Sequence, residues 1–233
     1  MSTVVDVILL FGTEITMGRN LEKDAVEMAA KNRRILENGL RIFAENGIEK
    51  VTMNDVARAA GIAVSSLYRY YSSKPKLVMA VGTWAWSAYV EENEKREAAL
   101  GRPDRTAAEM FDFYLESFLE LYRAQKALLR FNQFFNIYMA SEEISPEEMQ
   151  SYLDMIHGLE VRFGKIYRKA LEDGTLRTEL PEREMFSVTL HLMLAVVTRY
   201  AVGLVYNRNT DIEELQLQKD MLIQRFIGED KPL

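Results

Sequence analysis

Residues 51–82 have the pattern of two short helices that meet at a glycine turn and lead directly into a longer helix: VTMNDVARAAGIAVSSLYRYYSSKPKLVMAVG. Thr52 and Asp55 have the T-x-x-D spacing of a capping box, in which each side chain binds a free amide at a helix start. Gly61 can adopt the left-handed conformation that ends a helix at little cost. The segment therefore predicts a helix between Thr52 and Gly61, a second helix over about 63–70, and a third that follows at once.

The helix over 63–70 is rich in polar groups. Its apolar Leu67 is surrounded by small, hydroxyl-bearing and aromatic polar residues, namely Ser65, Ser66, Tyr68, Arg69 and Tyr70. A short helix with so many groups that form hydrogen bonds is poorly explained as part of a protein core. It suits a helix that lies in the major groove of DNA.

The charge of the chain is divided unevenly. Residues 29–82 contain nine Lys and Arg and four acidic residues, a net charge of +5, whereas the whole chain carries −6 and the remainder therefore −11. Binding to DNA requires local positive charge that displaces counterions from phosphates. The asymmetry predicts a small basic DNA-reading region on a larger acidic body, although chance clustering of surface charges is an alternative.

The rest of the chain shows clear helix starts and stops and no run with the period-two alternation of a strand. We expect an all-α fold of about nine helices. The further helices are expected over about 26–46, 74–99, 106 to about 125, 126–140, 146–172, 181–207 and 210–226. The first residues, 1–25, fit this plan least and are treated as an N-terminal extension of uncertain structure.

Neither apolar stretch of the chain predicts a membrane protein. Residues 4–11 are too short to span a bilayer and lack a basic leader, so we expect no signal peptide. Residues 185–206 are long enough to span, but they contain His191 and Arg199, and Arg is costly near the centre of a bilayer. A helix buried by its own domain and by a partner subunit explains the same pattern better than a membrane span. The absence of cysteine excludes disulfides and thiolate metal sites.

Residues 35–81, ILENGLRIFAENGIEKVTMNDVARAAGIAVSSLYRYYSSKPKLVMAV, resemble the DNA-binding region of the TetR family of bacterial transcriptional regulators. The run from Leu67 to Lys74 is the most specific part of the resemblance. The rest of the chain resembles the family only in being helical, acidic and of similar length.

The resemblance implies two domains in a cytoplasmic protein. Residues 26–73 would form a three-helix, helix-turn-helix DNA-binding domain. A long fourth helix would join it to a helical ligand-sensing and dimerisation domain over 74–233.

The resemblance also implies contacts with DNA. The residues at the matching positions are Thr52, Asn54, Val64, Ser65, Ser66, Tyr68, Tyr70 and Lys74. Lys74 would bind phosphate at a helix N-terminus, where ammonium and backbone amides attract the same anion. Val64 stands where the family often has a polar residue, and it can contact only a thymine methyl. Thr52 has the alternative of acting as a cap alone, and Tyr68 that of packing against the first helix; Tyr71 is expected in the core.

The body offers candidates for a ligand pocket and for a dimer interface. Aromatic residues and two histidines as polar anchors could line an apolar cavity: Trp86, Phe111, Tyr114, Phe118, Phe134, Tyr138, His157 and His191. For each of them, ordinary core packing is the alternative. Apolar residues of the last two helices are expected to form a four-helix contact between two subunits: Leu190, Leu194, Val197, Ala201, Leu215 and Leu222.

These patterns predict a homodimeric, ligand-responsive repressor of a palindromic DNA operator, released by a small apolar or amphipathic effector. The alternative is a DNA-binding protein that binds constitutively and whose body is a protein-interaction module. An enzyme is not expected, because there is no glycine-rich phosphate loop, no G-x-S-x-G elbow and no metal-ligand spacing. We therefore expect no catalytic residues, no metal and no cofactor.

Overall fold

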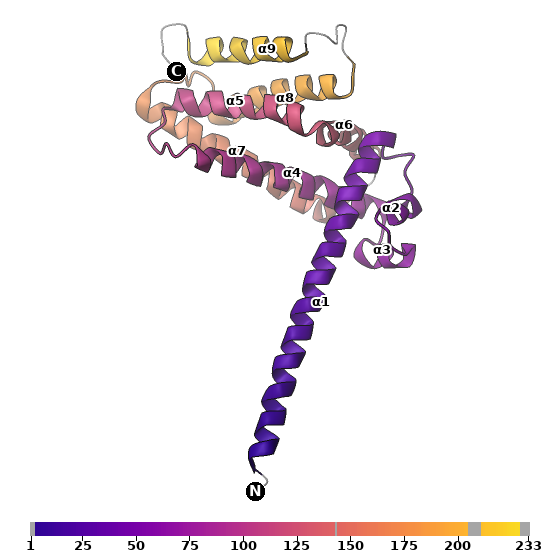
Figure 1. Cartoon of the computed structure of the whole chain (residues 1–233). Coiled ribbons are helices and arrows are strands. Elements are labelled where there is room, and N and C mark those ends of the chain that lie inside the picture. Colours follow the sequence, from indigo (N-terminus) through magenta and orange to yellow (C-terminus); the bar gives the residue numbers. More distant parts are fainter. Residues whose placement is uncertain (1–2, 143, 205–210, 229–233) are drawn as a thin grey trace.

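The computed structural model describes residues 3–142, 144–204 and 211–228. Within these ranges the regular structure is entirely helical, so the prediction of an all-α fold is confirmed. Figure 1 labels the helices, which are α1 (Thr3–Asn46), α2 (Met53–Ala59), α3 (Val64–Tyr70), α4 (Lys74–Ala99), α5 (Ala107–Ala124), α6 (Lys126–Ser141), α7 (Pro146–Asp173), α8 (Glu182–Ala201) and α9 (Asp211–Phe226).

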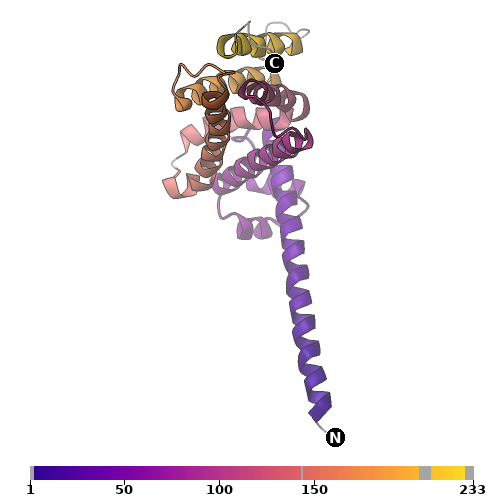
Figure 2. The ribbon, with the colours of Figure 1, turned by 90° about the vertical axis from the view of Figure 1, so that its left-hand side faces the viewer.

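Helix α1 is longer than the sequence predicted. It begins at Thr3 instead of near residue 26, and its N-terminal half extends away from the rest of the molecule (Figures 1 and 2). Gly12 and Gly18 lie within it, since a single glycine lowers helix propensity without ending a helix. The expected start near residue 26 is therefore wrong.

The C-terminal part of α1 packs with α2 and α3 into a small head. Phe43 from α1, Val56 from α2 and Leu67 from α3 are all fully buried in its core. The capping box predicted at Thr52 is present at the start of α2. Gly61 has a φ of +66°, the left-handed conformation that lets the chain turn sharply between α2 and α3.

Helix α4 connects the head to the body. It packs against α1 in the head and against α6 and α7 in the body. Helix α8 packs on α5 and α6, and α9 lies across α5 and α8 at the end of the body remote from the projecting part of α1 (Figure 1). The bundle thus gives α4 a position from which a change inside the body can reach the head.

Helix α8 ends earlier than predicted. It stops at Ala201, and Gly203 has a φ of +79°, a conformation that ends a helix. The expected end near Asn207 falls in residues 205–210, outside the described ranges. Over the described residues, no helix combines the length and the apolar character needed to cross a membrane.

Four residues predicted to form the dimer interface lie inside the subunit. Val197 and Ala201 of α8 and Leu215 and Leu222 of α9 are buried within this single chain. The reason is that α8 and α9 turn their most regular apolar stripes toward α5, α6 and each other. An interface on these helices must therefore use other residues.

Candidate nucleic-acid interface and ligand cavity

The turn that presents α3 is fixed by hydrogen bonds at both ends of α2. The Thr52 hydroxyl accepts from the Asp55 amide at 3.2 Å, and the Thr52 amide donates to the Asp55 carboxylate at 3.0 Å. Hydrogen bonds from the Thr52 side chain and backbone lower the pKa of Asp55. At the other end, the Ile62 amide donates to the Ala57 carbonyl at 3.0 Å. Thr52 therefore does act as a cap, and its side chain also remains exposed.

Helix α3 buries one side chain and exposes most of the others. Leu67 is inaccessible to solvent, whereas Tyr68 is 50% exposed. Val64 and Ser65 are also exposed at the N-terminus of α3. The exposure of Tyr68 does not favour the alternative that this side chain packs against the first helix. The N-terminal turn of α3 is therefore a surface of small and aromatic groups that is open to a partner.

The other predicted DNA contacts surround this surface. Asn54 is exposed at the start of α2, whereas Ser66 and Tyr70 on α3 are partly buried. Tyr71 is half-buried, as expected for a residue at the edge of the core, and its hydroxyl donates to Asn32 at 2.7 Å. Because the eight predicted residues lie in α2, in α3 and at the helix starts beside them, the fold brings them to one region of the head.

Lys74 occupies the start of α4, where Ser73 is the N-cap. Its ammonium donates to the Glu49 carbonyl at 3.2 Å and lies 5.5 Å from the centre of the Tyr138 ring. The side chain is partly buried. A contact between Lys74 and a phosphate would therefore require the ammonium to turn away from Glu49.

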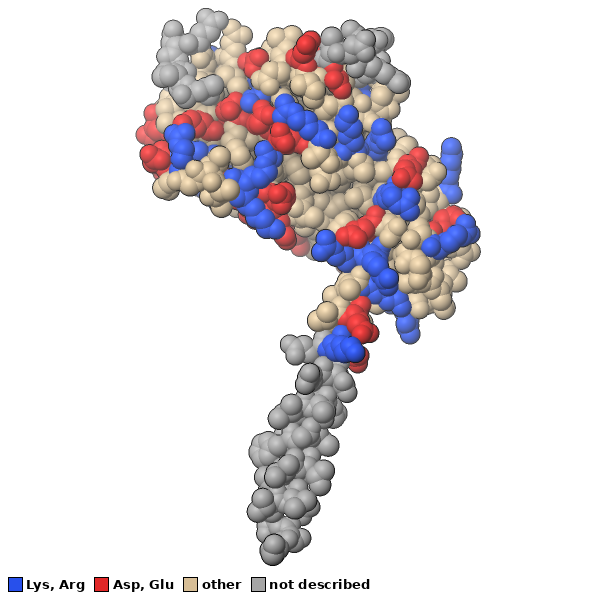
Figure 3. Space-filling view, in the orientation of Figure 1, with Lys and Arg blue, Asp and Glu red and all other residues tan. Residues whose placement is uncertain are grey.

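Basic side chains lie around the head (Figure 3). Arg33 and Arg41 are paired with glutamates one turn along α1. In the part of the chain that the structure describes, Arg34, Lys50 and Arg69 have no ion-pair partner, so their charges are available to an anionic partner. Unpaired cations beside an exposed short helix are the electrostatic pattern of a surface that binds nucleic acid.

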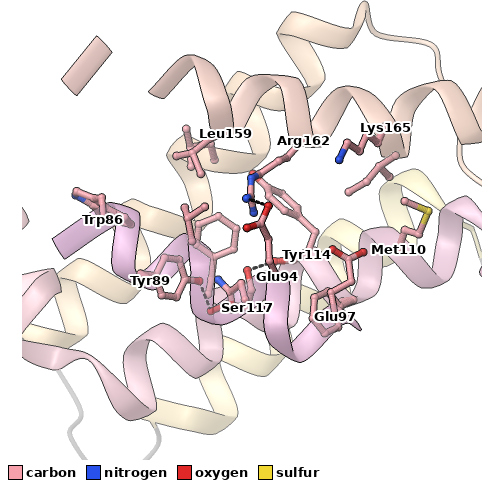
Figure 4. A pocket seen from close by; sticks show the side chains of 16 residues that line it. Trp86, Tyr89, Glu94, Glu97, Met110, Tyr114, Ser117, Leu159, Arg162 and Lys165 are labelled. Carbon is pink, nitrogen blue, oxygen red and sulfur yellow. Dashed lines mark hydrogen bonds and ion pairs between the residues drawn. The ribbon is translucent and has the colours of Figure 1, made fainter. Parts of the chain in front are cut away.

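A second site lies within the body. Helices α4, α5, α7 and α8 enclose a cavity of about 130 Å³ (Figure 4). Most of its wall is aromatic or aliphatic, and the representative residues are Trp86, Tyr89, Tyr114, Phe118, Leu159 and Leu190. Charged side chains of α4 and α7 also line it, so the cavity combines an apolar interior with polar groups at its edge.

Part of this wall is formed by residues that the sequence predicted for a ligand pocket. Of the residues predicted for a ligand pocket, Trp86, Tyr114 and Phe118 line the cavity. Leu190, which was predicted at the dimer interface, also lines it, because α8 packs against α5 and α7, which form part of the same wall. Leu194 is instead partly exposed in a shallow hollow of α8.

The other five predicted pocket residues do not line this cavity. Phe111 is fully buried and packs edge-on against Phe226 in the core. Phe134 lies against Gly47, and Tyr138 lies beside Lys74, so both join the body to the head. The two histidines are exposed. His157 lies on α7 beside Glu160, and His191 lies on α8 in the same hollow as Leu194.

The charged part of the wall was missed. Glu94 and Glu97 of α4 and Arg162 and Lys165 of α7 line the cavity. The sequence did contain a signal for it, because four residues of the wall share one face of α4 by their helical spacing. They are Trp86, Val90, Asn93 and Glu97. The spacing of aromatic residues alone does not indicate this mixed stripe.

The comparisons with known proteins agree with the geometry of the head. The family profile described as bacterial regulatory proteins of the tetR family matches residues 35–81. The head of this chain therefore has the sequence pattern of a tetR-family DNA-binding region. The matched segment corresponds to the C-terminal part of α1, to α2 and α3, and to the start of α4.

Two curated relatives are named as transcriptional regulators, which agrees with the expectation that the chain is not an enzyme. The HTH-type transcriptional regulator SAB2452 of Staphylococcus aureus is 36% identical over 61 residues, 26% of this chain and 31% of the relative. The uncharacterized HTH-type transcriptional regulator YerO of Bacillus subtilis is 24% identical over 192 residues, 81% of this chain and 61% of the relative. The match thus spans about a third of SAB2452 and less than two thirds of YerO.

The whole fold is shared with solved regulators. The transcriptional regulator FadR from Bacillus subtilis, solved in complex with stearoyl-CoA, superposes with a TM-score of 0.66 at 16% identity. The superposition covers 82% of this chain and 97% of FadR. At this identity the likeness establishes the shared fold alone.

Proposed function

We propose that this protein is a homodimeric repressor of the TetR family that binds a palindromic DNA operator and is released from it by a small-molecule effector. The observation that carries the proposal is the combination in α3 of a fully buried Leu67 with exposed Val64, Ser65 and Tyr68. Leu67 holds such a helix against the core of the head, while the side chains near the N-terminus of the helix face the solvent. This is the arrangement needed to read a major groove.

The residues of the head would divide the work between positioning and reading. We expect Thr52 and Tyr68 to contact phosphates, and such contacts orient a protein without reading sequence. Ser65 can form hydrogen bonds with base edges, whereas Val64 can contact only the methyl group of thymine. Asn54, Ser66, Tyr70 and Lys74 are proposed as further contacts around this centre.

A homodimer would place two copies of α3 on one face of DNA. Helix-turn-helix dimers bind half-sites about 34–36 Å apart, or a multiple of this distance, so a two-fold symmetric dimer implies a palindrome. The surface proposed for the dimer comprises the apolar side chains that α8 and α9 expose, Val188, Leu192, Leu217 and Met221. These replace the buried residues that the sequence suggested.

The cavity favours a ligand-responsive regulator over a constitutive DNA-binding protein with a fully packed body. Helix α4 begins at Lys74 beside the head and reaches the cavity at Trp86. Between them, Gly82 lies so close to Phe135 of α6 that an added Cβ would meet its ring at 3.2 Å. A ligand that shifts α4 would therefore move the head relative to α6. The coupling is limited by the difference in ligand affinity between the two arrangements.

Gel shift and footprinting on DNA upstream of the protein's own coding region test the proposal. The expected result is a protected palindrome, with a Tyr68→Ala variant that folds normally but binds more weakly. A Tyr152→Phe variant in the body serves as a matched control and should bind like the wild type. If the folded protein protects no sequence in neighbouring intergenic DNA, the proposal is wrong. Sedimentation of the free protein and of its complex tests the dimer.

The role of Lys74 has its own measurement. If its ammonium turns from Glu49 to a phosphate, a Lys74→Ala variant should bind all DNA sequences more weakly, and the slope of log affinity against log salt should fall by about one. An unchanged slope would remove Lys74 from the phosphate contacts and leave it as a link between α4 and the Glu49 carbonyl.

A further inference from the structure

The wall of the cavity contains two buried hydrogen-bond donors that lack partners. The Tyr114 hydroxyl and the Trp86 indole nitrogen are inaccessible to solvent, and neither has a hydrogen-bond partner among the described residues. An indole N–H can only donate. Burial holds the pKa of Tyr114 far above its usual range, so its hydroxyl keeps its proton and can donate as well. Buried polar groups normally have partners, and these two call for an acceptor.

Two other polar side chains in the wall already have hydrogen-bond partners. The Tyr89 hydroxyl donates to the Ser117 carbonyl at 2.7 Å, and the Ser117 hydroxyl donates to the Tyr114 carbonyl at 2.6 Å (Figure 4). Among the described residues of the wall, the buried side-chain donors without a partner are therefore those of Tyr114 and Trp86. A ligand that carried only donors would leave both of them unpaired.

Within the described ranges, both carboxylates of the cavity wall are in ion pairs, and one of its two cations is not. Glu94 forms an ion pair with Arg162 across the cavity (Figure 4), and Glu97 forms one with Arg105, which lies outside the cavity wall. Lys165 is exposed and has no ion-pair partner in the described part of the chain. Arg162 and Lys165 are three residues apart on α7 and so share a face of that helix. The edge of the cavity on the α7 side is therefore suited to an anion.

The volume limits the size of the ligand. A cavity of about 130 Å³ is close to that of an engineered apolar cavity of about 150 Å³ that holds benzene. Phe118, Leu159 and Ile166 provide apolar contacts for one ring. Any longer part of a ligand would have to leave the cavity past the exposed Glu94 and Lys165.

We propose that the effector is a small aromatic carboxylate, whose ring fills the cavity and whose carboxylate binds Lys165, Arg162 and the Tyr114 hydroxyl. This inference rests on the proposed function, since it names the chemical class of the effector. The carboxylate would replace Glu94 as the partner of Arg162 and so break the ion pair between α4 and α7. Because α4 leads to the head, this exchange is a route by which the ligand changes DNA binding.

Three one-ring probes test the class: benzoate, its neutral isostere benzamide and the cation benzylamine. Their affinities for the full-length protein can be measured by titration calorimetry. Benzoate should bind about tenfold more tightly than benzamide, since a charge-assisted pair is stronger than a neutral hydrogen bond. Benzylamine should bind most weakly, because it meets Lys165 and Arg162 with a like charge. Tighter binding of benzylamine, or binding of none of the probes, would overturn the inference.

Variants assign the roles. Lys165→Met should reduce the preference for benzoate over benzamide, whereas Lys169→Met one turn along α7 should not, because Lys169 pairs with Glu172 and does not line the cavity. Tyr114→Phe removes only the buried hydroxyl and should weaken benzoate and benzamide alike. An unchanged preference in Lys165→Met, with the variant folded, would refute the carboxylate site.

Operator binding measured on the same samples separates the two proposals. Operator binding without binding of any probe would refute the effector class and leave the repressor intact. Benzoate binding without operator binding would refute the repressor and leave the effector class intact. Benzoate binding that leaves the operator complex unchanged would support the site and refute the exchange of the Arg162–Glu94 pair as the releasing step.

Discussion

The head and the body of this protein place their functional residues on opposite sides of their helices. In the head, α3 buries Leu67 and exposes Val64 and Tyr68, so the predicted site is a surface. In the body, Tyr114 and Trp86 turn toward neighbouring helices, so the site is an interior. The family profile matches only the head, residues 35–81. DNA has the same backbone geometry for every regulator, whereas effectors differ in their chemistry. The sequence of the head is therefore expected to vary less between regulators than the sequence of the body.

The largest effect should come from the core of the head. Leu67→Ala removes the one side chain that α3 buries completely, at an expected cost of about 2–5 kcal/mol of unfolding free energy. DNA binding should be lost. Benzoate binding should survive, because the cavity belongs to the body. Urea unfolding, gel shift and calorimetry measure the three properties. Loss of ligand binding as well would show that the head and the body unfold as one unit.

The next effect should come from the body. Lys219 of α9 lies 2.8 Å from both Asp112 and Glu116 of α5 and is almost completely buried. Burial alone would lower the pKa of Lys219, but hydrogen bonds to the two carboxylates outweigh it and raise the pKa. Lys219→Met should cost about 1–3 kcal/mol, between the values for an exposed pair and a fully buried pair.

The control for Lys219 is Lys169→Met, which removes a solvent-exposed pair one turn apart on α7 and should cost less than about 1 kcal/mol. Urea unfolding measures both variants. Equal costs would mean that α9 is held to α5 by its apolar contacts alone.

Helix positions could be predicted from sequence because local chemistry determines them. Thr52 and Asp55, Thr106 and Glu109, and Pro146 marked helix starts that the structure confirms within a residue or two. The exposed residues of α3 could be predicted for a similar reason, since a helix of seven residues with a single large apolar side chain has only one way to pack.

The body could not be predicted to the same depth. Val197 and Leu215 have the helical spacing of an interface, but the same spacing serves a core, and only the packing of α8 and α9 on α5 decides between the two. The Arg162–Glu94 pair joins α7 and α4, and no local pattern in the sequence brings two such residues together. The start of α1 was missed because glycine weakens a helix without ending it.

A smaller effect allows a direct comparison of head and body, since each contains a capping box. Thr52 caps α2 through Asp55, and Thr106 caps α5 through Glu109 with the same pattern of hydrogen bonds. Thr52→Ala and Thr106→Ala should each cost about 1 kcal/mol in urea unfolding. Only Thr52→Ala should also weaken DNA binding. Equal DNA affinities for the two variants would reduce Thr52 to a cap.

The smallest effect is the pH dependence of the same two boxes. Hydrogen bonds from Thr52 lower the pKa of Asp55 in the head, and hydrogen bonds from Thr106 and then Arg102 lower the pKa of Glu109 in the body. A lowered pKa means that the unfolded chain binds the proton more tightly, so each box stabilises the protein at neutral pH. The contribution falls as the pH drops below the unfolded values of about 4. The melting temperatures of Asp55→Asn and of the wild type should therefore converge on acidification. A constant difference between them, down to the lowest pH at which both proteins fold, would show that the carboxylate charge does not contribute to the cap.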